Sequence, residues 1–209
     1  MTEGANPMVG HQRGQTLRRL PIAILLAASS AWAAPEDRGP RGLLLSGGSG
    51  VITGTVTDEK GRNAGGFLGQ ASVIRIGEEA LPGLTLGLEI VFGDANANAD
   101  KYATSLSGLL VQITYRPFVD PAGLVFIAGT GIGGGSLEAT AGEDFSGAVV
   151  GGLHELGVAY EISLYGDASS GLVAALTARW LGVPASGETP TAIQTYLFGI
   201  EATWYAGRD

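Results

Sequence analysis

The feature that most constrains the fold is a ten-residue ribbon, 84–93, in which large apolar residues alternate with mostly small or polar ones. The apolar positions are Leu84, Leu86, Leu88, Ile90 and Phe92, and the positions between them are Thr85, Gly87, Glu89, Val91 and Gly93. Because successive side chains on a strand point to opposite faces, this ribbon predicts a β-strand with one apolar face. Similar ribbons recur down the chain, which predicts an all-β barrel.

Eight strands are predicted in all, and they alternate in direction as an antiparallel up-and-down barrel would. Their ranges are 42–56, 65–77, 84–93, 103–116, 124–138, 147–163, 171–182 and 191–205. All seven prolines after residue 33 fall outside these strands. Proline has no N–H to donate to a strand ladder, so its placement supports the division.

The first 33 residues have the pattern of an export signal. Three arginines precede an apolar stretch at 20–28, which is too short to span a bilayer as a helix, and Ala31-Trp32-Ala33 fits a small-x-small cleavage site. The predicted organisation is therefore a signal peptide at 1–33, a short leader at 34–41, a barrel at 42–205 and a C-terminal tail at 206–209.

The charge balance excludes one class of partner. Cleavage after Ala33 removes three arginines and Glu3, which leaves 9 basic and 19 acidic residues and a formal charge of −10 with histidine neutral. Nucleic-acid binding needs a basic surface, so no nucleic-acid partner is expected. The chain has no cysteine, which excludes disulfides, thiolate metal sites and lipid attachment at cysteine. No cofactor is predicted.

The polar positions of the predicted strands indicate which face points inward. This set is rich in Gly and Thr, poor in Lys, and mixes Glu with Arg, as expected for a packed lumen whose charges neutralise one another. The predicted lumen network consists of Glu89, Gln112, Arg116, Glu155, Glu161, Arg179 and Glu201. A soluble barrel with its apolar set inside has the same period of two, so alternation alone does not decide between the two arrangements.

Aromatic residues favour the membrane arrangement, because Tyr and Trp prefer membrane–water interfaces. One predicted belt, toward the outer strand ends, holds Phe67, Phe92, Tyr102, Trp180 and Tyr196. The other holds Tyr115, Phe118, Phe126, Tyr160, Tyr165, Trp204 and Tyr205. Two belts that flank aliphatic strand centres are typical of transmembrane barrels.

The export signal, the hairpins and the closing segment 199–205 resemble small outer-membrane β-barrel proteins of the OmpA/OmpX type. Gly199, Ala202 and Trp204 occupy the places of the glycine, a spaced apolar residue and the terminal aromatic in the signal read by the barrel-assembly machinery. The chain departs from that pattern, because Ala202 is small and residues 206–209 extend past the aromatic pair. The resemblance implies an outer-membrane location, with the lipid bilayer, lipopolysaccharide and the assembly machinery as partners.

The connections predicted on the outer side are 57–64, 94–102, 139–146 and 183–190, and they are acidic. An even strand number places both termini on the periplasmic side, as in single-chain outer-membrane barrels. One acidic stretch resembles the start of a calcium loop, with Asp94, Asn96, Asn98 and Asp100 as candidate ligands. It lacks the glycine of the sixth position and the glutamate of the twelfth, so it predicts at most a weak cation site.

Two further motifs contain residue types that could carry chemistry. His154 alternates with the apolar residues of its strand, which predicts an interfacial, structural histidine, and Glu155 faces the other way and cannot assist it. The segment 129–134 matches G-x-G-x-x-G, but no helix follows it, so it predicts a glycine-rich strand and not a phosphate site. No catalytic residue is predicted.

The predicted function is therefore an integral outer-membrane barrel with a plugged polar lumen and a structural or surface-interaction role. Eight strands leave little room for an aqueous pore. Three alternatives remain: a small-ligand binder or narrow conduit, a lipid A-modifying enzyme that uses His154, and a soluble secreted barrel that binds a ligand inside.

Overall fold

The computed structural model describes residues 41–57, 63–97, 102–117, 123–139, 147–166, 170–183 and 192–207. Throughout these residues the regular structure is β-strand. The strands are β1 (Arg41–Thr57), β2 (Asn63–Leu81), β3 (Leu84–Ala97), β4 (Tyr102–Tyr115), β5 (Gly123–Ala139), β6 (Gly147–Gly166), β7 (Gly171–Val183) and β8 (Ala192–Gly207). The described residues include no helix long and apolar enough to cross a membrane. The predicted signal peptide lies outside them.

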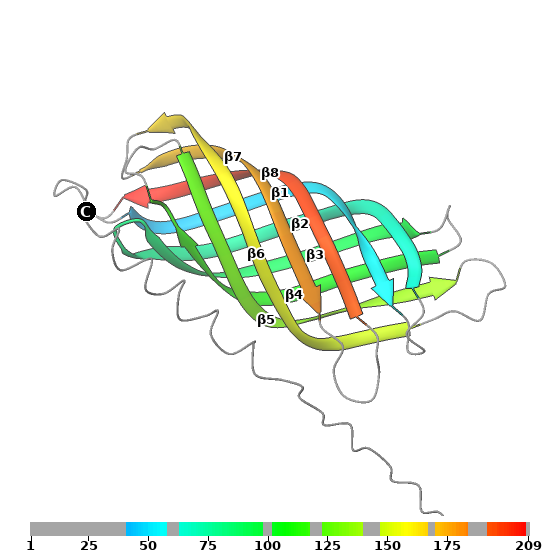
Figure 1. The fold of residues 1–209 in the computed structure, drawn as a ribbon. Helices are drawn as coiled ribbons and strands as arrows, with labels where there is room; N and C mark the ends of the chain where they lie inside the picture. The colour runs from blue at the N-terminus through cyan, green and yellow to red at the C-terminus, as the bar shows by residue number, and fades with distance from the viewer. Residues whose placement is uncertain are drawn as a thin grey trace, which may run out of the picture. The chain divides into compact units, whose positions relative to one another are not determined.

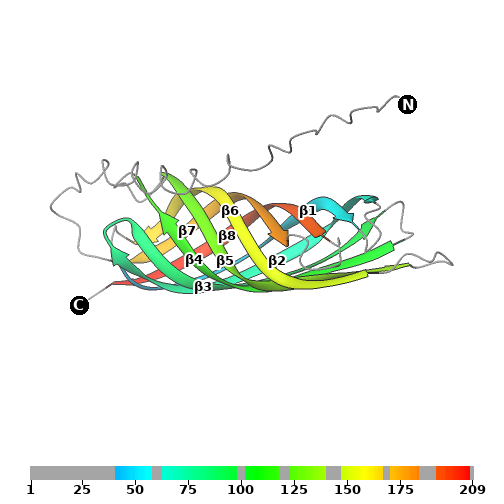
Figure 2. The ribbon, with the colours of Figure 1, turned by 60° about the horizontal axis from the view of Figure 1, so that its bottom comes forward.

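Each strand pairs antiparallel with its neighbours in sequence, and β8 pairs with β1 to close the sheet. The closure is visible in two views, where β8 (red) lies beside β1 (blue) (Figures 1 and 2). The prediction of an eight-stranded, antiparallel, all-β barrel is confirmed. Closure also means that no strand edge of the sheet is left unpaired.

The register fixes how strongly the strands tilt. Following paired residues from Ile90 through β4 and β5 leads to Gly152 on β6. Following them the other way, through β2, β1, β8 and β7, leads to Ile162 on the same strand. These two residues are ten apart, so the shear number is 10, which for eight strands corresponds to a tilt of about 40°.

The opening ribbon behaves as its alternation predicts. Leu86, Leu88, Ile90 and Phe92 point outward and are 45 to 50% exposed, whereas Glu89 and Val91 point into the lumen and are fully buried. The same alternation of buried and exposed residues runs along the other strands. The barrel thus has an apolar outer face over much of its wall.

We call the end where odd-numbered strands begin the turn end, and the end where they finish the loop end. At the turn end, β2 runs four residues further than predicted, and only Pro82 and Gly83 connect it to β3. Gly83 has φ +76°, which suits the third position of a type II turn after proline. The backbone N–H of Gly83 donates a hydrogen bond to the Glu79 carboxylate (2.6 Å). Glu79 lies beyond the predicted end of β2 at residue 77, yet it belongs to this strand and is buried.

Other strand ends also differ from the prediction. β3 continues to Ala97, which places Asp94 in a strand and not in an outer connection. β6 continues to Gly166, and β8 runs to Gly207, two residues into the predicted tail. Small and polar residues mark loops only on average, and here ladder pairing with the neighbouring strand extends the β-structure through them.

Candidate functional site

The most highly organised polar group in the barrel is a charged network at mid-lumen, centred on Arg179. Nη1 of Arg179 donates to both carboxylate oxygens of Glu89 (2.9 and 2.7 Å) and to Glu155 (2.8 Å), and Nη2 donates to Glu201. The amide of Gln112 donates to Glu89 (2.6 Å) and to Glu155 (2.9 Å). One guanidinium and one amide therefore hold three carboxylates together out of contact with solvent.

Arg75 completes this network on the opposite side. Its Nη1 donates to the side-chain oxygen of Gln112 (2.7 Å), and its Nη2 lies 3.6 Å from Glu201. The six side chains belong to β2, β3, β4, β6, β7 and β8, so the contacts form a closed circuit across the lumen. We call Arg75, Glu89, Gln112, Glu155, Arg179 and Glu201 the central network.

The two strands that contribute no side chain to the central network have glycine beside it. A Cβ on Gly48 of β1 would lie 2.3 Å from Cγ of Glu201, and one on Gly129 of β5 would lie 2.9 Å from the Glu155 carboxylate. The glycines therefore leave the space that the charged side chains fill. The G-x-G-x-x-G segment is part of strand β5, in agreement with the prediction of a glycine-rich strand.

A second polar group lies nearer the turn end and is built on Arg116. Its guanidinium donates two parallel hydrogen bonds to Glu161 (2.8 and 2.7 Å) and a longer one to Thr85 (3.4 Å). It also hydrogen-bonds the hydroxyl of Tyr205 and lies 5.1 Å from the centre of that ring. The Tyr205 hydroxyl in turn donates to Glu161 (3.1 Å). We call these four residues the turn-end network.

The loop end of the lumen is apolar, which differs from the expected polar lumen. A single cluster of buried apolar side chains, contributed by seven of the eight strands, fills it. Its members are Ile52, Val56, Phe67, Ala71, Val73, Val91, Ala95, Leu106, Leu110, Val149, Leu153, Leu181, Val183, Ile193 and Leu197. Inward positions near the loop end are thus mainly apolar, with Thr104 and Thr195 as buried polar exceptions, whereas the acids and arginines occupy mid-lumen and the turn end.

The seven residues predicted as one lumen network are all buried, but they form two groups. Arg116 and Glu161 belong to the turn-end network, and the other five belong to the central network. Sequence reasoning missed Arg75, although its place between Ile74 and Ile76 carries the same alternation signal. It also missed Thr85.

On the outward face of the barrel, polar and apolar residues are distributed in the opposite way to the lumen. Around the middle of the wall it is aliphatic except for Phe198, and the exposed residues there are Leu45, Ile74, Ile76, Leu88, Ile90, Leu109, Val111, Ile113, Leu156, Val158, Leu176, Phe198 and Ile200. Toward the loop end its described positions are mainly polar and include Thr53, Thr55, Gln70, Asp94, Asn96, Ser105, Ser107, Ser136, Glu138 and Gln194, with Leu68 and Val150 as apolar exceptions. The outer face of the wall therefore changes from apolar to polar at about the level where the lumen changes from polar to apolar.

Of the twelve aromatic residues in the two predicted belts, eight lie on the outer surface: Phe92, Tyr115, Phe126, Tyr160, Tyr165, Trp180, Tyr196 and Trp204. Phe118 and the side chain of Tyr102 lie outside what the structure describes. Phe92, Trp180 and Tyr196 stand at the loop-side edge of the aliphatic band, and Tyr115, Tyr160 and Trp204 stand near its turn-side edge. Two other assignments are wrong. Phe67 and Tyr205 point into the lumen and are 4% and 3% exposed, because each has the parity of its strand's buried face.

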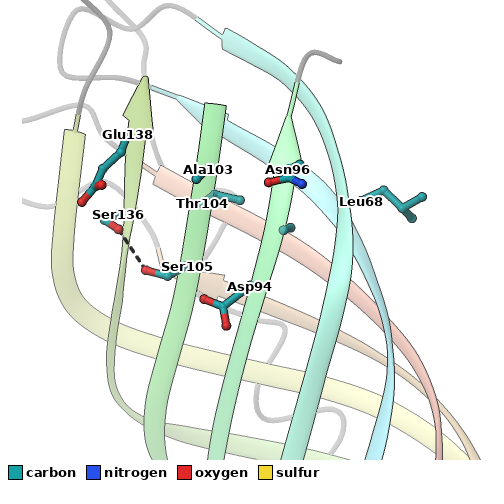
Figure 3. A pocket seen from close by; sticks show the side chains of 9 residues that line it. Leu68, Asp94, Asn96, Ala103, Thr104, Ser105, Ser136 and Glu138 are labelled. Carbon is teal, nitrogen blue, oxygen red and sulfur yellow. Dashed lines mark hydrogen bonds between the residues drawn. The ribbon is translucent and has the colours of Figure 1, made fainter. Parts of the chain in front are cut away.

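A hollow of about 410 Å³ lies in the wall near the loop end of β3, β4 and β5 (Figure 3). Ser105 and Ser136 are joined across it by a hydrogen bond (2.9 Å), and Asp94 and Asn96 line it from β3. These two are half of the candidate cation ligands, and Asn98 and Asp100 lie outside the described residues. Within the described part of the chain, no group of three acidic, histidine or cysteine residues is placed to hold a metal ion.

His154 faces outward from β6, as its parity predicts, and is exposed. Its Nδ1 is 3.1 Å from the hydroxyl of Thr130, the residue opposite it on β5. Glu155 points to the other side of the sheet and hydrogen-bonds Arg179. Among the described residues, His154 thus has a hydroxyl partner but no carboxylate contact that would orient it as a general base.

No family model matches the sequence, and no curated protein matches it. The fold does have counterparts among solved structures. Ail, the attachment invasion locus protein of Yersinia pestis, solved with the heparin analogue sucrose octasulfate, superimposes with a TM-score of 0.53 at 10% identity, over 78% of this chain and 99% of Ail. Neisserial surface protein A gives a TM-score of 0.51 at 13% identity, over 80% of this chain and 99% of that one.

Both counterparts are outer-membrane eight-stranded β-barrels, and this chain shares their closed antiparallel fold. Sequence identities of 10 and 13% limit the likeness to the fold. What the barrel does must therefore be argued from its own residues.

Proposed function

We propose that this protein is an integral outer-membrane barrel whose lumen is closed by its own side chains. Its role is either structural or the binding of a partner at the cell surface. The observation that carries the proposal is the outward face, where an aliphatic band is bordered by Phe92, Trp180 and Tyr196 on one side and by Tyr115, Tyr160 and Trp204 on the other. This is the outer surface that a bilayer requires of a barrel.

The amount of exposed apolar surface argues against a soluble barrel. The described residues include 29 large hydrophobic side chains that are exposed. Soluble monomers rarely expose a contiguous apolar patch of more than a few hundred Å². A soluble, ligand-binding barrel would also need its charged residues on the outside, whereas Glu89, Glu155 and Arg179 lie in the lumen.

The filling of the lumen supports a closed barrel and not a conduit. The central network and the turn-end network cross the lumen at two levels, and the apolar cluster occupies the loop end. Leu110 and Leu153 of the apolar cluster and Glu89 of the central network are completely buried in the lumen. Eight-stranded barrels are in general just wide enough for side chains to fill.

The surface exposed to an extracellular partner would be the loop-end wall and the connections beyond it. The charged residues that the structure places on this wall, Asp94 and Glu138, are acidic. Ail was solved with a sulfated heparin analogue. The acids on this wall give no support for a polyanionic ligand of that kind, and they favour a cationic partner if one binds here.

A lipid-modifying enzyme is the less favoured alternative. It would need His154 beside a nucleophile or an acid in reach of lipid. Thr130 is the hydrogen-bond partner that the structure gives His154, and a threonine hydroxyl needs a base that is itself oriented by a third group. The histidine is therefore better explained by its position at the interface.

The membrane assignment can be tested without background labelling, because the chain has no cysteine. Single-cysteine variants Asn96→Cys and Ser136→Cys lie in the loop-end wall, and Val111→Cys and Ala128→Cys lie in the aliphatic band. In intact cells a membrane-impermeant maleimide should label the first pair and not the second. Equal labelling of all four, or recovery of the protein in the soluble periplasmic fraction, contradicts the proposal.

Two further measurements complete the test. The unheated protein should migrate differently from the boiled protein in a denaturing gel, as expected for a stable barrel. Reconstituted in planar bilayers, it should give no steady conductance. Sustained channels would favour the conduit alternative over the closed barrel, while leaving the membrane location intact.

A further inference from the structure

His154 is chemically unusual for its place in the barrel. The arginines among the described side chains, Arg75, Arg116 and Arg179, all point into the lumen. Among the described side chains, His154 is therefore the one outward-facing group that can become positively charged. The outer leaflet of the membrane is the surface that such a group would meet.

The surroundings of His154 leave its second ring nitrogen accessible. Nδ1 is engaged by Thr130, which holds the imidazole plane against β5. On the loop side the next outward residue of β6 is Gly152, and a Cβ there would be 3.6 Å from Nε2. No side chain of Gly152 covers this nitrogen, so it borders open space above bare backbone.

An indole forms the other border of this space. The residue opposite His154 on β7 is Gly182, and the six-membered ring of Trp180 occupies the position that a side chain of Gly182 would take, 2.5 and 2.7 Å from an added Cβ. Trp180 also pairs with Tyr196 of β8. The imidazole therefore lies in the aromatic belt, the level at which lipid headgroups meet the barrel.

We propose that Nε2 of His154 donates a hydrogen bond to a phosphate oxygen of an outer-leaflet lipid. When the Thr130 hydroxyl donates to Nδ1, the neutral ring carries its proton on Nε2, and the protonated ring donates from both nitrogens. Either form presents an N–H toward the headgroup level, and a charged acceptor such as phosphate makes the stronger hydrogen bond. The contact rests on the proposed membrane location and gives the barrel a preferred lipid neighbour on its β5–β7 side.

Solid-state NMR can detect this contact directly. The chain has two histidines, His11 in the predicted signal peptide and His154, so protein labelled with ¹⁵N-histidine gives a simple spectrum that the variant His154→Gln assigns. The barrel is reconstituted in a glycolipid matrix that contains lipid A with its phosphates. Recoupling of ¹⁵N to ³¹P should then dephase the Nε2 signal and leave Nδ1 much less affected.

Two variants separate a built site from random headgroup contact. Gly152→Leu places a side chain over Nε2 and should abolish the dephasing while His154 and Thr130 are unchanged. Ala148→Leu adds the same side chain to the same outward face of β6, further from the histidine, and should leave the dephasing intact. Persistent dephasing in Gly152→Leu overturns the proposal.

Two control samples complete the design. In the glycolipid matrix without lipid A but with inorganic phosphate in the buffer, Nε2 should not be dephased, and dephasing in that sample alone would assign the site to free phosphate and overturn the lipid assignment. Absence of dephasing with lipid A overturns the inference as well. The cysteine-labelling pattern of the same reconstituted protein shows whether the barrel has inserted, so a failure of the membrane proposal is distinguished from a failure of this contact.

Discussion

The two halves of the barrel are built with opposite polarity. Toward the turn end and at mid-height the outer face is aliphatic, and the lumen holds Arg116, Arg179 and their carboxylate partners beside two small clusters of buried apolar side chains. Toward the loop end the outer face is mainly polar, and the lumen holds an apolar cluster that includes Leu106 and Leu153. The first half is arranged like a membrane barrel, and the second like a small soluble protein with a hydrophobic core.

On the proposed membrane placement, the difference follows from the surroundings of each half. Where lipid would cover the wall, apolar side chains need not be buried in the lumen to be removed from water, and polar groups are satisfied by pairing inside. Where water covers the wall, an apolar interior contributes the usual hydrophobic stabilisation. On the proposed placement, the loop half stands above the bilayer and supports the connections that a partner would meet.

Replacing Arg179, the central cation of the charged half, should cause the largest loss of folding free energy. Arg179→Met leaves Glu89, Glu155 and Glu201 without their shared donor, and removal of one partner from a buried ion pair typically costs about 3–5 kcal/mol. Urea unfolding in micelles, followed by tryptophan fluorescence, measures the loss. Adding Glu89→Gln to the variant should recover part of it, and an unchanged unfolding midpoint for Arg179→Met would show that the network contributes little.

The apolar half should be sensitive to cavities. Leu153 is fully buried, and its Cδ2 lies where a Cβ of Gly108 or Gly133 would be, within 2.2 and 2.8 Å. Leu153→Ala should therefore lower the free energy of unfolding by about 3 kcal/mol. Leu109→Ala, on the outward face of β4, removes the same atoms and serves as the control. Similar losses for both variants would mean that the loop half has no packed core of its own.

An arginine introduced on the outer wall tests where along the barrel the apolar part of the outer face gives way to the polar part. Ile90→Arg places a cation in the middle of the aliphatic band and should cost about 2 kcal/mol or more of folding free energy in lipid vesicles. Ser107→Arg lies two positions loop-ward of Leu109 on the outward face of β4 and should cost about 1 kcal/mol or less. Equal costs would place the membrane boundary elsewhere on the wall.

The smallest effect is expected in the hollow near the loop end. Ser105→Ala removes the hydrogen bond to Ser136 and should lower stability by about 0.5–1 kcal/mol at most, because water can satisfy the remaining hydroxyl. Thermal unfolding of the reconstituted protein provides the measurement. A loss as large as that of Leu153→Ala would show that this hydroxyl pair is part of the core.

The sequence predicted which face of the sheet a side chain lies on better than it predicted which side chains contact one another. Alternation assigned Glu89, Glu155 and Arg179 to the inward face correctly, because the direction of a side chain on a strand depends only on its position parity. It failed at Phe67 and Tyr205, where aromatic character was given more weight than parity. It also gave no indication that Arg116 and Arg179 belong to different networks, since their separation along the lumen depends on how neighbouring strands are staggered.

By itself, the sequence determined the strands, their two faces and the closed all-β architecture, because these follow from local alternation and from where proline and glycine interrupt it. Only the tertiary structure decided which charges meet. Arg179 and Glu89 are 90 residues apart, and they contact each other because a shear of 10 brings β7 and β3 to the same level across a narrow lumen. The division of the lumen into a charged part and an apolar part has the same origin, since stagger determines which inward residues share a level.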